Sequence, residues 1–72
     1  MELKIGDKVM WKGGWGTDAP RPAKITSIDL CETKGSKYGN PVKSVSWSLK
    51  EYIAVGLDNG HWAYGTQLEA IQ

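Results

Sequence analysis

The sequence offers few residues that could take part in catalysis. His61 is its single imidazole and Cys31 its single thiol, and nucleophilic catalysis would need a base beside the nucleophile. No neighbour of Cys31 indicates a lowered thiol pKa, so this residue is expected to be a small buried hydrophobe. Asp58 belongs to an Asn-Gly turn, where its carboxylate is expected to bond the turn backbone. We therefore expect no enzymatic activity and no catalytic residue.

Metal and cofactor sites are not expected either. One Cys and one His cannot supply the four ligands of a structural zinc site. The Gly-rich residues 12–17 lack the Walker spacing and the GxGxxG fingerprint, and they do not lead into a helix that would hold a phosphate. We interpret them as a flexible connector that carries Trp15.

Aromatic side chains are the main candidates for binding. The chain has four Trp, three Tyr and no Phe. The binding hypothesis places four of these rings along one groove that holds an extended peptide, a cationic side chain or an unstacked base. These four candidates are Trp15, Tyr38, Trp62 and Tyr64. The alternative is that most rings fill the core, where Trp11, Trp47 and Trp62 are expected because aromatic residues dominate small cores.

Three lysines form a second candidate surface. Lys34, Lys37 and Lys43 lie around Tyr38 in and after a polar loop, and such a mixture can bind single-stranded nucleic acid. The formal net charge is only +1, whereas nucleic-acid-binding domains usually carry a basic excess. We therefore expect a protein or peptide partner, with nucleic-acid binding as the alternative.

Length and composition indicate one small domain over residues 1–72. This is near the lower limit for a core that folds without a disulfide, and a single cysteine forms none within the chain. No stretch is apolar enough to cross a membrane, and residues 1–8 lack the apolar segment of a signal peptide. We expect a cytoplasmic protein with no membrane association, either a monomer or a weak dimer paired through an edge strand.

The strongest signal for local structure is Asn59-Gly60, which lies between two apolar runs. A type I′ turn needs positive φ at both central residues, which Asn and Gly tolerate best. The pair predicts a hairpin whose first strand covers residues 52–57 and whose second strand carries Trp62 and Tyr64 on one face.

Alternating residues predict four more strands, at 8–11, 23–32, 43–48 and 68–71. The alternation slips at Thr26-Ser27, which indicates a β-bulge, and small barrels need such a bend to close. Loops are predicted at residues 12–22 and 33–41, a turn at 49–51, and a single 3-10 turn at 65–67. The pattern predicts an all-β barrel of five or six antiparallel strands.

This order of elements resembles the small SH3-like β-barrels, including their Tudor-like and KOW-like groups. The start IGDKVMW is similar to their first strand, and the end LDNGHWAYGTQLEAI is similar to their last hairpin, turn and strand. Small bacterial and phage domains have a similar DNGHWAY ending. The resemblance implies an aromatic-lined face that binds peptides, modified side chains or nucleic acid, without choosing among them. Residues 33–51 exceed what a minimal barrel needs, so they form an extra strand or a loop that packs over one side.

Overall fold

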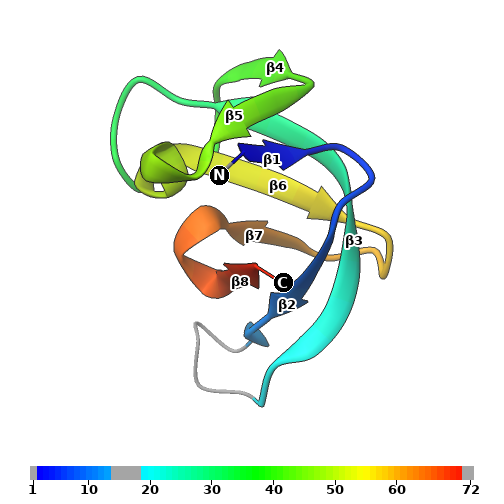
Figure 1. Ribbon diagram of the computed structural model, residues 1–72. Helices are drawn as coiled ribbons and strands as arrows, with labels where there is room; N and C mark the ends of the chain where they lie inside the picture. The colour runs from blue at the N-terminus through cyan, green and yellow to red at the C-terminus, as the bar shows by residue number, and fades with distance from the viewer. Residues whose placement is uncertain (1, 14–18, 71–72) are drawn as a thin grey trace.

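A computed structural model describes residues 2–13 and 19–70 and shows a curled antiparallel sheet that forms a half-barrel (Figure 1). The all-β fold expected from the sequence is confirmed. The elements are β1 (Glu2–Lys4), β2 (Lys8–Trp11), β3 (Arg21–Leu30), β4 (Asn40–Val42), β5 (Ser44–Ser46), η1 (Trp47–Tyr52), β6 (Ile53–Leu57), β7 (Trp62–Tyr64), η2 (Gly65–Gln67) and β8 (Leu68–Ala70). The two η elements are short 3-10 helices.

The main sheet is organised around β3, its longest strand. Its strand order is β7-β6-β3-β2-β8, and β4 also pairs with β3. The first half of β3 pairs with β2, and its second half lies between β4 and β6. Figure 1 shows β3 curving along one side of the half-barrel, so that a single strand links both halves of the sheet.

The predicted bulge lies where β3 bends. The register with β6 shifts between Ile25 and Ser27, so Thr26 is the inserted residue. Opposite this point, the amide of Gly56 donates a 3.1 Å hydrogen bond to the Ser27 hydroxyl. A Cβ at Gly56 would lie 2.5 Å from Ser27 Oγ and 3.0 Å from Thr26 Oγ1. A larger residue at position 56 would therefore have to displace these hydroxyl groups at the bulge.

The core is formed by side chains that both sheets direct into the interior of the half-barrel. Those with almost no exposed surface are β-branched side chains from β2, β3 and β6, which pack well on a pleated sheet: Val9, Ile25, Ile28, Ile53 and Val55. Leu3 and Val45 add the β1–β5 pair to this cluster. The predicted inward faces of residues 8–11, 23–30 and 53–57 are confirmed.

Residues 33–51 contain the extra strand β4, which was one of the two alternatives expected for this long segment. Other details of this segment and of the N-terminus differ from the sequence prediction. Residues 2–4, where no strand was predicted, form β1, and β4 begins at Asn40, within the loop predicted at residues 33–41. The strand predicted at residues 43–48 ends at Ser46, because η1 begins at Trp47. Ser46 caps this helix by accepting a 3.4 Å hydrogen bond from the Ser48 amide. The segment thus supplies the extra strand β4, a shorter form of the predicted strand as β5, and a 3-10 helix where a turn was predicted.

The hairpin lies where it was predicted, but its turn differs from type I′. The Gly60 amide donates to the Leu57 carbonyl, and the Leu57 amide donates to the His61 carbonyl. Asp58 and Asn59 are therefore the central residues of the turn, and Gly60 follows them with a φ of 84°. This is the pattern of a three-residue hairpin loop with a glycine bulge. The predicted short 3-10 turn before the last strand is confirmed as η2.

Candidate ligand-binding face

Three neighbouring strands, β3, β6 and β7, present one face away from the core. Side chains alternate between the faces of a sheet, so the register sets which residues share this face. The first row across the strands is Ser27, Gly56 and Trp62, and the second is Asp29, Ala54 and Tyr64. The middle strand contributes only small residues, and the outer strands contribute larger ones. This arrangement leaves a shallow hollow along β6.

The Trp62 ring forms one wall of this hollow, and the Tyr64 ring packs against it. Trp62 is 40 % exposed, and its ring meets that of Tyr64 edge-on, with 5.0 Å between centroids and 87° between planes. An edge-to-face pair of this kind is a favoured aromatic geometry. The prediction that Trp62 and Tyr64 share a face is confirmed. The prediction that Trp62 belongs to the core is wrong, because β7 faces the core through Ala63, which is 1 % exposed.

The loop between β3 and β4 brings Lys37 and Tyr38 to the same face. The Lys37 Nζ lies 4.7 Å from the centroid of the Trp62 ring and 5.8 Å from that of Tyr38. Tyr38 is 80 % exposed. The Ser36 hydroxyl accepts a 3.3 Å hydrogen bond from the Tyr38 amide, which fixes the backbone at this point of the loop. The structure thus links three of the four predicted binding residues. Lys37 lies against the rings of Tyr38 and Trp62, and Tyr64 packs edge-on against Trp62.

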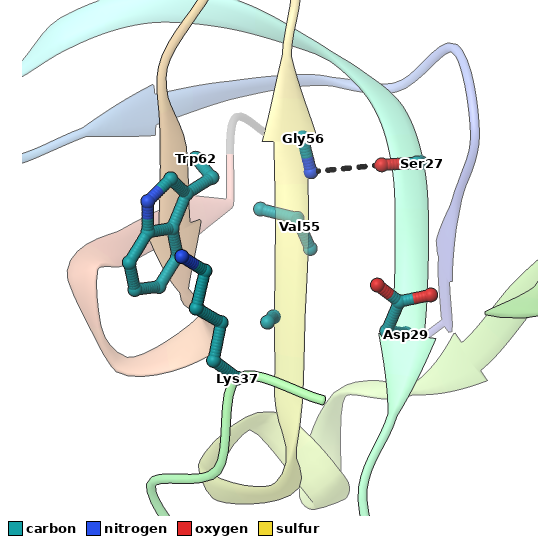
Figure 2. A pocket seen from close by; sticks show the side chains of 7 residues that line it. Ser27, Asp29, Lys37, Val55, Gly56 and Trp62 are labelled. Atoms are coloured by element: carbon teal, nitrogen blue, oxygen red, sulfur yellow. Dashed lines mark hydrogen bonds between the residues drawn. The ribbon is translucent and has the colours of Figure 1, made fainter. Parts of the chain in front are cut away.

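A pocket of about 110 Å³ lies between the aromatic wall and β3. Figure 2 shows Trp62 on one side of β6, Asp29 and Ser27 on the other, and the Lys37 side chain reaching towards the indole ring. Ala54 and Gly56 contribute to its lining from the middle strand. The pocket therefore combines an aromatic face, a carboxylate and a hydroxyl around a small floor.

A second hollow lies against Tyr64. It has a volume of about 240 Å³ and is lined by Lys34, Gly35, Glu51, Tyr64 and Thr66. Here Lys34 Nζ forms a 3.2 Å ion pair with Glu51. The hydrogen bond to Glu51 and the charge of its carboxylate raise the pKa of Lys34 above its ordinary value. Glu51 thus neutralises one of the three lysines predicted to bind nucleic acid.

Of the candidates that the structure describes, Lys43, Trp11 and Trp47 do not line the pocket between Trp62 and Asp29. Lys43 lies in the bend between β4 and β5, where its carbonyl accepts a hydrogen bond from the Ile5 amide. Trp15 lies outside the described residues. Trp11 is buried in the core as predicted, and Trp47 packs against the core from η1 with part of its surface exposed.

The residues considered for catalysis have structural partners. The His61 ring lies 4.9 Å from that of Trp11, centroid to centroid. The Asp58 carboxylate accepts a hydrogen bond from the Lys24 amide, in another strand rather than in its own turn as predicted. Cys31 is buried as predicted, and its Sγ lies 3.3 Å from the Ser36 carbonyl oxygen. Among residues 2–13 and 19–70, no group of three His, Cys, Asp or Glu residues could hold a metal ion.

Sequence reasoning missed two parts of this face, the carboxylate of Asp29 and the contact between Lys37 and Trp62. The alternation of Ile28 and Leu30 towards the core did place Asp29 outward, and Ala54 with Gly56 indicated a thin outer face on β6. The position of Lys37 depends on the path of a loop, which alternation does not describe.

Comparison with known protein families, curated proteins and solved structures finds no significant match to this chain. Within the described residues, no helix has the length and apolar character required to span a membrane.

Proposed function

We propose that this chain is a non-enzymatic binding module that recognises a protein segment through the face formed by Tyr38, Trp62 and Tyr64. The observation that carries the proposal is the exposure of Trp62 beside a pocket on the outside of the sheet. Indole and phenol rings provide large contact areas at low entropic cost, and they are enriched where proteins bind one another. We place this module among the SH3-like barrels and in the cytoplasm.

Partly exposed aromatic side chains support binding rather than packing. Burying the Trp62 ring against the interior would stabilise so small a fold, yet β7 directs Ala63 inward in its place. The free energy that burial of the Trp62 ring would contribute is instead gained when a partner covers the ring. Tyr38, which is 80 % exposed, extends the apolar surface beyond the sheet.

Recognition of a protein is favoured over nucleic-acid binding by the charges near the face. Phosphate contacts need several uncompensated cations, and here Lys34 is paired with Glu51. Asp29 adds a carboxylate to the pocket wall, which would repel a phosphate backbone. A loop lysine and an aromatic ring in contact also occur in proteins that bind single strands, so the experiment includes both ligands.

Selection from a random-sequence peptide library displayed on phage tests the proposal. We expect peptides that are enriched on the wild-type protein to lose binding to Trp62→Ala. The control is Leu49→Ala, which removes an exposed apolar side chain from η1 rather than from the face.

Two results would overturn the proposal. Peptides that bind Trp62→Ala as well as they bind the wild type would exclude this face. Failure to enrich any peptide, together with binding of single-stranded oligonucleotides that weakens steeply with salt, would assign the protein to nucleic acid.

A further inference from the structure

The pocket on the outer face has the chemistry of a cation receptor. An aromatic face attracts a cation within about 6 Å of its centroid because the ring quadrupole is negative there, and Trp62 supplies such a face. Asp29 supplies a formal negative charge from β3, on the other side of β6 (Figure 2). No hydrogen bond or ion pair joins the Asp29 carboxylate to another residue in the described part of the chain. The carboxylate is therefore available to a ligand.

A cation already lies at this pocket, and it belongs to the chain itself. The Lys37 ammonium lies 4.7 Å from the Trp62 centroid and lines the pocket. Lys37 is an exposed loop residue, and its hydrocarbon stem crosses from the loop towards the ring in Figure 2. Rotation of this side chain alone would uncover the indole face without any change in the sheet.

Small residues on β6 leave open the pocket of about 110 Å³ between Trp62 and Asp29. A Cβ at Gly56 would meet the hydroxyl oxygens of Ser27 and Thr26 at the bulge, and Ala54 is the next outward residue along β6. Larger residues at these positions would fill the hollow between Trp62 and Asp29. The pocket thus lies beside the bulge, with Ser27 and Gly56 both lining it.

We propose that this pocket receives a lysine or arginine side chain of the partner segment, and that Lys37 is a tethered competitor that must leave first. The inference rests on the proposed function, because it specifies which side chain of a bound segment the face selects. A tethered group competes at a high effective concentration even when its own contact is weak. The apparent affinity for an external cation is then reduced by the fraction of molecules in which Lys37 occupies the pocket.

Titration with small probes, followed by the NMR signal of the Trp62 indole N–H, tests this inference. The probes are N-acetyl-lysine amide, N-acetyl-arginine amide and the uncharged N-acetyl-norleucine amide. We expect the two cationic probes to shift the signal and the norleucine probe to have little effect. In Lys37→Gln, we expect their affinity to increase about three- to sixfold, because a contact of the strength usual at exposed sites blocks most of the molecules.

Two matched variants control for charge alone. Lys43→Gln removes the same positive charge outside the pocket, so it should leave the affinity almost unchanged. Asp29→Asn keeps the size of the side chain but removes its charge, so it should weaken the binding of both cationic probes.

The inference is overturned if Lys37→Gln and Lys43→Gln have the same effect, or if no cationic probe shifts the Trp62 signal in Lys37→Gln. Equal binding of the norleucine probe would overturn the selection for cations. None of these results depends on the peptide selection. In that selection, a peptide that needs Trp62 for binding but has no basic residue would support the proposed function and contradict this inference.

Discussion

Asp58 and Lys24 are joined by two hydrogen bonds, which continue the pairing of β3 with β6 past Leu57, the last residue of β6. The Asp58 amide donates to the Lys24 carbonyl at 3.0 Å, and the Lys24 amide donates to the Asp58 carboxylate, also at 3.0 Å. A turn residue thus bonds the strand next to its own hairpin. This link lies on the N-terminal side of the bulge, where the register of β3 and β6 shifts.

Loss of the Asp58 carboxylate is expected to destabilise the fold. Asp58→Ala leaves the Lys24 amide without its acceptor, and we expect the free energy of unfolding to fall by about 1 kcal/mol. Asp58→Asn, which keeps an acceptor oxygen, should retain most of the stability. Urea denaturation followed by circular dichroism measures both variants, and equal midpoints for Asp58→Ala and the wild type would contradict the prediction.

A side chain at position 56 is expected to strain the bulge. The Cβ of Gly56→Ala would lie 2.5 Å from Ser27 Oγ, and overpacking of this kind costs about 1–3 kcal/mol. Ser27→Ala removes the obstructing oxygen, so the double variant should lose less stability than the sum of the two single variants. A double-mutant cycle measures this coupling, and additive losses would show that the Ser27 hydroxyl is not the obstacle.

Two tryptophans are expected to differ sharply in their contribution to stability. Trp11 is 7 % exposed and Trp62 is 40 % exposed. We expect Trp11→Ala to cost about 3–5 kcal/mol and Trp62→Ala about 1 kcal/mol, because only the first removes a core ring. Thermal denaturation compares them, and Trp11→Phe is the milder variant if Trp11→Ala does not fold. A large loss of stability in Trp62→Ala would show that Trp62 contributes to the core, and it would argue against the proposed binding face.

The ion pair of Lys34 with Glu51 is expected to appear in the titration of this lysine. The hydrogen bond and the charge of Glu51 raise the pKa of Lys34 in the folded state. The pair therefore stabilises the fold below the ordinary lysine pKa, and this contribution is lost as the pH rises through the raised value. Glu51→Gln should lower the pKa of Lys34, as measured by the NMR shift of its Cε carbon. An unchanged pKa would contradict the pairing.

Local patterns in the sequence predicted the scaffold better than the site. Ile25 and Ile28 indicated the bulge because both face the core although they are three residues apart, which requires one inserted residue. The turn after Leu57 was misassigned because Asp58, Asn59 and Gly60 all suit turns, and bonds to β3 help to fix the register. Residues 33–41 were predicted to be a loop, yet Asn40 and Pro41 belong to the short strand β4, which pairs with β3. Proline is tolerated in an edge strand of this kind.

The binding face depended on information that alternation does not contain. Trp62 and Tyr64 were placed on one face correctly, but the choice between inside and outside depends on the space left by the other strands. Ile53, Val55 and Leu57 already fill the interior beside β7, and Ala63 fits the remaining volume. Only the folded structure shows that the side chain of Lys37, which is distant in sequence, lies against the indole ring of Trp62.

The two ends of the segment that carries Lys37 meet at one hydrogen bond, in which the Cys31 amide donates to the Tyr52 carbonyl at 2.7 Å. The chain therefore leaves β3 and enters β6 at the same place. Loop closure costs grow slowly with length, so residues can be gained or lost near Lys37 without altering the register of β3 and β6. Changes in residues 32–51, in evolution or in the laboratory, could then alter which partner is bound, while β3 and β6 keep their sequence.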